Sequence, residues 1–309
     1  MIYSAVPNRE AALGDQIASI DPASGNITAT WPAPTNPHIL AIPDDQSRLY
    51  YTYGAVNNAG LSGFSLGSEQ IVAVDLSTGM AGASFPSRSP SSDFSYSIVD
   101  LAAVPTQSRS LISIDNLYNS AILSDGGNLF VNLGLDSIRV YDDGSPRSTF
   151  IGAHAFTCTF LSPGASASRV YCSDGATFSR LQVDSGGISL LDSFALIPGR
   201  GSFGHMAFSA GRVYTSTGLI IDPEGKRVIN RVNAQGPVAV DGNAVYWLDP
   251  SGSNTQAPSL MLRSFDTSTL QPVAVNQINV TTADPTRLIV CGAGCLAFRA
   301  GNEVYIVKH

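Results

Sequence analysis

The chain carries little charge. Only 13% of its 309 residues are Asp, Glu, Lys or Arg, and just two of them are lysines, Lys226 and Lys308. Globular domains usually carry about 25%. The net charge is −7, and the 17 basic residues are scattered along the chain. Because nucleic acids and anionic membrane surfaces are bound by clustered Lys and Arg, the sequence predicts no nucleic-acid partner.

Long apolar runs are missing as well. No stretch approaches the ~20 consecutive apolar residues that a membrane-spanning helix needs, so we expect no membrane insertion. The opening residues MIYSAVPN lack the charged segment followed by an apolar segment that marks a signal peptide. They resemble the middle of a repeat instead, so the compartment has to be judged from other features.

Recognisable catalytic motifs are absent too. The sequence has no P-loop, HExxH, paired CxxC or GxSxG motif. Residues 199–204 match GxGxxG, but a dinucleotide site needs a helix after that motif, and a strand-like HMAF follows here. We interpret this stretch as a loop. With only two tryptophans, the chain also lacks the repeated Trp pattern expected of quinoprotein propellers, and no organic cofactor is predicted.

What the chain does contain is a repeat of about 44 residues, a length typical of propeller blades. Residues 38–79 show it best, as apolar strands separated by polar turns. One kind of turn joins the first and second strands, and a second kind, which begins with Asp, joins the third and fourth. Asp suits such turns because its carboxylate accepts a backbone N–H two residues on. The pattern predicts an all-β protein, a β-propeller of four-stranded antiparallel blades, as a single domain over residues 1–309.

The blade count depends on residues 115–136. If this stretch is an extra strand pair, the chain holds about 28 strands, or seven blades of four. If it is an insertion, six blades remain the alternative. The last segment, CLAFRAGNEVYIVKH, supplies strands of the first and second type, whereas the N-terminus opens on a second-type strand. We therefore expect the ring to close by pairing of the N- and C-terminal segments, which removes exposed sheet edges.

The repeat has a family resemblance. RLYYTY with IVAVDLSTG, and RVYTST with LIIDPEG, resemble the YVTN-type repeats of bacterial extracytoplasmic seven-bladed propellers. The resemblance covers nearly the whole chain, but its motifs are structural and specify the fold more than an activity. It implies a surface or envelope-associated binding module. Some seven-bladed relatives are lyases or lactonases that use a metal at the central channel.

The four cysteines predict two disulfides. Cys158 and Cys172 lie on apparent neighbouring strands, with Ala165 midway between them. Directly opposed Cβ atoms would be roughly 4.5–5.5 Å apart, which is close enough to bond. Cys291 and Cys295 flank a Gly-Ala-Gly loop and could close a small ring. The alternative is four buried thiols. Disulfides together with scarce lysine favour a secreted or periplasmic protein.

Histidine is rare, and its placement suggests a candidate metal site. His38, His154 and His205 each precede a first-type strand, and Asp100 stands in the comparable position of the third repeat. First strands of a propeller line the central channel, and their starts lie at one mouth. His38, Asp100 and His205, with His154 nearby, could therefore hold a divalent metal. The alternative is ordinary polar residues bound to water.

Aromatic residues in the strands allow two readings as well. Trp31, Trp247, Tyr51 and Tyr53 could stack against sugars if they are exposed. Aromatic residues at strand positions more commonly pack blades together.

Two functions follow from these observations. The first is an extracytoplasmic propeller that binds a protein or a glycan across one face, through the polar loops 54–68, 86–97 and 250–258. The alternative is a metal-dependent lyase or lactonase-like hydrolase, with its site at the channel mouth. The geometry of the histidines distinguishes them, because a metal site needs the imidazoles in one coordination sphere.

Overall fold

The computed structural model describes most of the chain. The described residues are 1–6, 14–34, 37–43, 45–54, 69–86, 94–104, 106–122, 128–152, 158–164, 166, 168–196, 205–250 and 258–309. For residues 94–97, 99, 108, 114–122 and 128–136 only the main chain is described.

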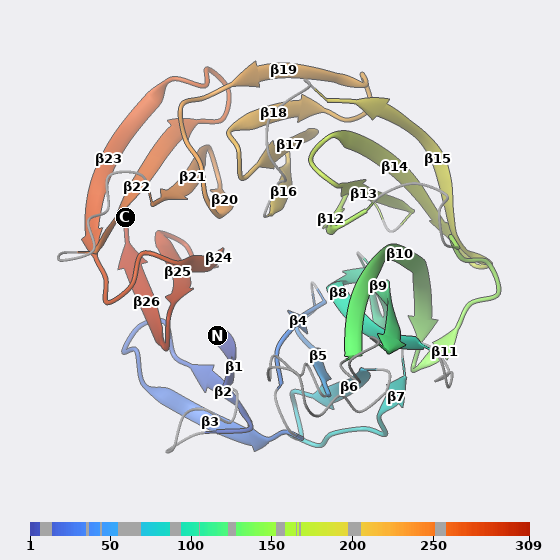
Figure 1. Cartoon of the computed structure of the whole chain (residues 1–309). Helices are drawn as coiled ribbons and strands as arrows, with labels where there is room; N and C mark the ends of the chain where they lie inside the picture. The colour runs from blue at the N-terminus through green and yellow to red at the C-terminus, as the bar shows by residue number, and fades with distance from the viewer. Residues whose placement is uncertain are drawn as a thin grey trace.

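The described residues form seven antiparallel sheets arranged in a ring (Figure 1). The first sheet contains β1 (Ile2–Val6), β2 (Gln16–Ile20) and β3 (Ile27–Pro32); the second β4 (Leu40–Ala41), β5 (Arg48–Tyr53), β6 (Gln70–Asp75) and β7 (Phe85–Pro86); the third β8 (Phe94–Val104), β9 (Gln107–Ile122), β10 (Asn128–Asp142) and β11 (Ser145–Pro146); the fourth β12 (Phe160–Pro163), β13 (Arg169–Ser173), β14 (Thr177–Asp184) and β15 (Gly187–Ala195). The fifth contains β16 (Met206–Ser209), β17 (Arg212–Thr215), β18 (Leu219–Asp222) and β19 (Arg227–Arg231); the sixth β20 (Val238–Asp241), β21 (Ala244–Asp249), β22 (Ser259–Asp266) and β23 (Pro272–Asn279); the seventh β24 (Pro285–Gly292), β25 (Cys295–Ala300) and β26 (Glu303–Lys308). The seven-bladed propeller predicted from the repeat is confirmed.

The core lies between neighbouring sheets. Each middle strand alternates apolar side chains between its two faces, so both faces are buried against adjacent blades. Tyr171 and Phe178 of the fourth sheet, for example, pack with Val213 and Ile221 of the fifth. Each large apolar side chain buried in this way stabilises the fold by about 1.5–3 kcal/mol. The ring is held together by these inter-blade clusters.

The turns between third and fourth strands have the predicted chemistry. Asp75 Oδ1 accepts the N–H of Ser77 at 2.9 Å and of Thr78 at 3.0 Å. Gly79 then takes a φ of +70°, in the left-handed region that glycine adopts without a steric cost. The side-chain oxygen and the glycine together reverse the chain, which lets the fourth strand fold back on the third.

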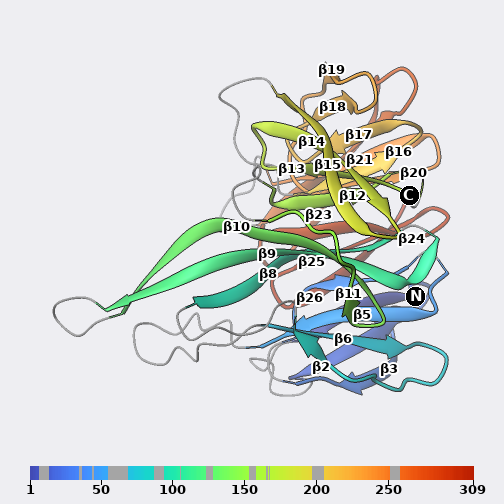
Figure 2. The same ribbon diagram turned by 90° about the vertical axis from the view of Figure 1, so that its right-hand side faces the viewer.

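Residues 115–122 and 128–136, the described part of this stretch, form no separate strand pair, and this part of the prediction is wrong. They continue β9 and β10 as one long hairpin, in which Asp115 pairs with Ser137 and Ile122 with Asn128. The start of β8 pairs alongside, from Phe94 opposite Asn119. We call the main chain of 94–98, 115–122 and 128–137 the arm. Figure 2 shows that the arm projects from one face of the ring, whereas both chain termini lie on the opposite face.

The ring also closes differently from the prediction. RLIVCG forms a strand of its own, so β24 is the first strand of the last sheet, and CLAFRA and EVYIVK are its second and third. Among the described strands, β1 pairs only with β2, and β26 only with β25. The two end sheets meet instead through side chains, where Ile2 and Ile20 pack on Ala297. Closure therefore rests on this apolar packing and on a hydrogen bond that Arg299 Nη1 of β25 donates to the carbonyl of Ala5 of β1 at 3.2 Å, without strand exchange between the chain ends.

Candidate functional site

His38 is tied to a buried carboxylate of its own blade. Its Nε2 lies 3.3 Å from Glu69 Oε2, and the Glu69 side chain is buried. The same Glu69 oxygen accepts the N–H of Ile98, on β8, at 2.8 Å. Glu69 therefore connects the second sheet with the third, and His38 is held at this junction.

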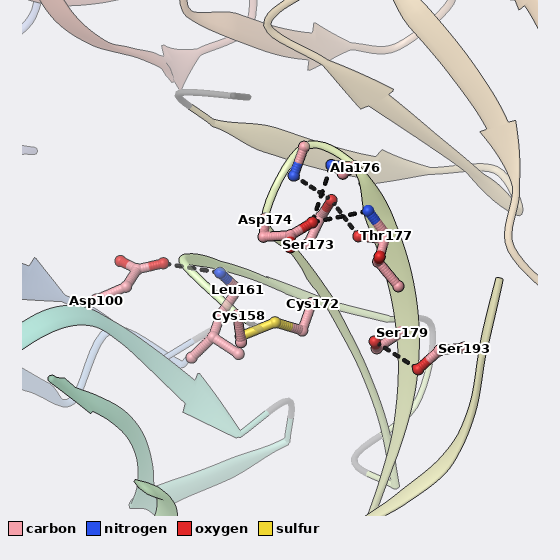
Figure 3. Close-up of a disulfide and its surroundings, with 11 residues drawn as sticks. Asp100, Cys158, Leu161, Cys172, Ser173, Asp174, Ala176, Thr177, Ser179 and Ser193 are labelled. Atoms are coloured by element: carbon pink, nitrogen blue, oxygen red, sulfur yellow. Dashed lines mark hydrogen bonds between the residues drawn. A yellow bond between two sulfur atoms is a disulfide. The ribbon is translucent and has the colours of Figure 1, made fainter. Parts of the chain in front are cut away.

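Asp100 is a buried junction between three sheets. From β8, its Oδ1 accepts the N–H of Leu101 at 3.0 Å and Nη2 of Arg287, on β24, at 3.0 Å. Its Oδ2 accepts the N–H of Leu161, on β12, at 2.9 Å (Figure 3). Burial raises the pKa of the Asp100 carboxyl, while Arg287 and the two N–H groups act in the opposite direction. The carboxylate thus joins the third, fourth and seventh blades.

His205 lies just before β16 and is largely buried. Its ring centroid is 5.9 Å from that of Phe160. Burial lowers the pKa of His205 to about 4, and the charge of Arg287 adds to this effect, while a hydrogen bond with the backbone of Thr286 opposes it. The imidazole is consequently neutral near pH 7.

Arg287 is the residue that sequence reasoning missed. It lies in the stretch TRLIV, and its only signal was a charge placed within an otherwise apolar first strand. The guanidinium reaches a carboxylate 187 residues away in the sequence and acts on His205 as well. Arg287 therefore sets the charge balance around two of the predicted metal ligands.

The described residues do not fit a metal site. Among them, no group of three or more His, Cys, Asp or Glu side chains is arranged to hold an ion. Arg287 already supplies the positive charge beside Asp100, so a metal would have to displace it. His154 lies outside the described residues. Metal binding stays a prediction, which elemental analysis of the wild type and of a His38→Ala, His205→Ala variant tests.

Both predicted disulfides are present. The Cα atoms of Cys158 and Cys172 are 5.6 Å apart, and those of Cys291 and Cys295 are 5.1 Å apart. The expected strand register was wrong, however. Cys172 pairs with Leu161, and Cys158 lies ahead of β12, so the bond joins a strand to the segment entering the blade (Figure 3). Disulfides of this kind persist in oxidising compartments.

Two of the candidate stacking aromatics are packing residues. Trp247 is fully buried, and its Nε1 donates to the carbonyl of Thr215 at 2.9 Å. Tyr51 is buried as well, while Trp31 and Tyr53 are half-buried. The GxGxxG stretch 199–204 and most of the three predicted recognition loops lie outside the described residues.

The arm is the other candidate site. β9 and β10 have 16 and 15 residues, whereas the longest described strand outside the third sheet, β15, has nine. The extra length carries three paired strands away from the ring (Figure 2). In the sequence, residues 115–136 are rich in Leu, Phe, Ile and Val, with three Asp and no Lys or Arg. The other six described sheets form with shorter strands.

Comparison with known proteins supports the fold alone. No protein-family model and no curated protein matches the chain. Among solved structures, it is similar to the hydrazine synthase of Kuenenia stuttgartiensis, with a TM-score of 0.62, 11% identity, and coverage of 96% of this chain and 90% of that one. A putative 6-phosphogluconolactonase from Bacteroides uniformis has a TM-score of 0.60, 12% identity and coverage of 99% and 91%. The β-propeller domain of Cps50 (Swd1) from Myceliophteria thermophila has a TM-score of 0.57, 11% identity and coverage of 100% and 96%. Because the identities are so low and the named functions differ, these matches show a propeller and no activity.

Proposed function

We propose that this chain is an extracytoplasmic β-propeller that binds a protein or a glycan through the face from which the arm projects. The arm is the observation that carries the proposal. It is a three-stranded, hydrogen-bonded extension, and the strands of the other six described sheets are shorter. Ordering each residue costs about 1–2 kcal/mol in backbone entropy. An extension of this kind makes sense if a ligand uses it, as recognition segments on rigid scaffolds do.

The position and composition of the arm fit this role. Both termini lie on the opposite face (Figure 2), so the arm face is unobstructed by them. Residues 115–136 combine apolar side chains with three aspartates and no basic residue. Such a surface would offer apolar contact area and weak negative charge, which suits a partner that is neutral or basic.

The extracytoplasmic location rests on the two disulfides. Bonds of this type are rare in reducing compartments. In the described part of the chain, no helix is long and apolar enough to cross a membrane. Thiol labelling of the protein as recovered from its native compartment tests the location, since fully oxidised cysteines are expected there and reactive thiols would contradict it.

The binding role is tested by shortening the arm. In the proposed variant an Asn-Gly turn joins Asp115 to Ser137 and removes residues 116–136. These two residues pair in the hairpin, and Asn-Gly is the preferred two-residue hairpin turn, so the ring should fold unchanged. Wild type and variant are compared on a glycan array and on a panel of purified extracellular proteins.

We expect the wild type to bind one class of ligand and the shortened variant to lose at least tenfold in affinity, with the same melting temperature. A Ser77→Ala, Thr78→Ala variant, altered in a turn between third and fourth strands, is the matched control and should bind normally. Retention of full binding without the arm would refute the proposal.

A further inference from the structure

Arg287 and Asp100 join two sheets that are not neighbours in the ring. β24, in the seventh sheet, and β8, in the third, lie on opposite sides of the ring axis (Figure 1). The guanidinium therefore reaches across the axis to the carboxylate, to which its Nη2 donates at 3.0 Å. His205, just before β16 of the fifth sheet, reaches the same place, because its ring donates to the backbone carbonyl of Thr286 on β24. Three sheets thus bring polar side chains together at the axis.

We call Asp100, His205 and Arg287 the axial cluster, and this cluster lies at the base of the arm. On β8, Asp100 follows shortly after Ile98, where the arm ends. The axial cluster is therefore on the side of the ring from which the arm projects (Figure 2). Glu69 lies at the same junction, since its Oε2 accepts the N–H of Ile98 at 2.8 Å.

The axial cluster has hydrogen-bonding groups left for a ligand. Arginine carries five N–H donors, and of the described residues only Asp100 accepts from the Arg287 side chain, which is 47% exposed. The His205 ring donates through one nitrogen, so the other nitrogen of the neutral imidazole is an acceptor. Asp100 already holds the guanidinium in place, which lowers the entropy that a ligand would lose in ordering it.

The charges at this place favour a neutral ligand. Arg287 balances Asp100, and the second buried carboxylate, Glu69, is paired with His38. A cation would have to displace Arg287, whereas an anion would approach two buried carboxylates. A neutral ligand avoids both costs. It needs two adjacent oxygens to match the planar guanidinium fork and one hydroxyl proton to donate to His205. Neighbouring hydroxyl groups of a sugar ring provide both.

We propose that the axial cluster binds a neutral sugar residue, whose two neighbouring ring hydroxyls accept from the Arg287 guanidinium while one of them donates to the second ring nitrogen of His205. Asp100 is then a positioning residue for the guanidinium. This inference rests on the proposed function, because it narrows the protein-or-glycan ligand to a glycan and places one of its sugars at the base of the arm.

The test uses the methyl glycosides of glucose, galactose and mannose as probes and follows the ring signals of His205 in the full chain by NMR. We expect a saturable change with at least one of the three. Monodeoxy analogues of that glycoside then remove one hydroxyl at a time. Loss of either of two neighbouring hydroxyls should weaken binding by about tenfold or more, the value of one hydrogen bond to a charged group, and loss of the others should have little effect.

A variant of Arg287 provides the second measurement. Arg287→Lys keeps the positive charge beside Asp100 but lacks the planar fork, so the glycoside should bind to it about tenfold or more weakly. Arg231→Lys, altered at an exposed arginine, is the matched control and should bind normally. Because the deoxy series uses the wild type, its result is independent of any effect of Arg287→Lys on folding.

No saturable change of His205 with any of the three glycosides would refute the inference. A change with sodium acetate or sodium glucuronate that no neutral glycoside produces would also refute it, because the axial cluster would then be an anion site. The variant without residues 116–136 separates the inference from the proposed function. If that variant loses glycan-array binding while no glycoside affects His205 in the wild type, the role of the arm stands and the sugar site fails. If the variant keeps full array binding while a glycoside does affect His205, the role of the arm fails and the sugar site stands.

Discussion

Replacing Arg287 with alanine should destabilise the ring through Asp100. The carboxylate is buried where the third, fourth and seventh sheets meet, and Arg287 Nη2 donates to it at 3.0 Å. In the variant the two backbone N–H groups of Leu101 and Leu161 would be its only remaining partners among the contacts described above. The Asp100 carboxyl would then be a buried charge without a counter-ion, and such groups are costly.

The size of the effect follows from the geometry. Two unit charges about 4 Å apart attract each other by about 4 kcal/mol at an effective dielectric constant of about 20. The Arg287 side chain is 47% exposed, so water screens part of this attraction, and fixing a long side chain costs rotamer entropy. We therefore expect Arg287→Ala to lower the free energy of unfolding by about 1–2 kcal/mol at pH 7.

The effect should depend on pH with a definite sign. Burial raises the pKa of Asp100 in the folded state, so the folded protein holds this proton more tightly than the unfolded chain does. The stability that the Asp100 carboxyl contributes is fully present below its unfolded-state pKa and is lost as pH rises through its folded-state pKa. Removing Arg287 raises the folded pKa further. The loss of unfolding free energy caused by Arg287→Ala should therefore be small near pH 3.5 and grow toward pH 7.

Urea unfolding at both pH values measures this, with Arg231→Ala as the matched control because Arg231 is exposed. In an Asp100→Asn background, Arg287→Ala should cost at most a few tenths of a kcal/mol. A loss that is equal at both pH values, or unchanged in the Asn background, would show that Arg287 acts by packing and would refute the electrostatic reasoning.

Three further predictions concern single groups. Replacing Cys158 and Cys172 with alanine should lower the free energy of unfolding by about 3 kcal/mol, the entropy of a loop of about 15 residues, as measured by urea unfolding of the oxidised variant and the oxidised wild type. His205 should titrate near pH 4 by NMR, and titration near pH 6.5 would contradict its burial. Because the folded-state pKa is depressed, the contribution of His205 to stability is present above its unfolded-state pKa and is lost as pH falls through the folded-state pKa. The pKa of the Asp266 carboxyl should be about 2, because Ser268 and Thr269 donate hydrogen bonds to it. Its contribution to stability should be lost as pH falls from about 4 toward 2. Asp266→Ala should remove this loss of stability at low pH.

The blade architecture could be predicted because its determinants are local. In IVAVD followed by LSTG, the apolar run buries Ile71 on one face of the strand and Val72 and Val74 on the other, and Asp75 fixes the turn with its own side chain. Repetition of the unit then leaves few other ways to bury both faces of each strand. The same kind of turn lies between β2 and β3, where the Asp21 carboxylate accepts the N–H of Ala23. It identifies β2 and β3 as the third and fourth strands of a blade.

The arm could not be predicted because a strand that leaves the ring looks locally like a new strand. Residues 128–136 place Leu or Val at every second position, as blade strands do. What distinguishes them is the pairing of Asp115 with Ser137 within one continuous ladder, and register is a property of two segments together. The shift of Cys172 to a position opposite Leu161 has the same cause, since the length of a turn does not fix the register on its own.

The chemistry around Asp100 was harder still to predict, because its partner Arg287 is 187 residues away in the sequence. His38, His205 and Asp100 were chosen as ligand types at similar positions in the repeat; His38 and His205 precede the first strands β4 and β16, whereas Asp100 lies within β8. A carboxylate, however, can serve a metal or a guanidinium, and its local sequence contains nothing that decides between them. Arg287 is charged at every accessible pH, and ring closure brings it within 3.0 Å of Asp100. The pairing with Arg287 neutralises both charges and commits that carboxylate to joining the third, fourth and seventh blades.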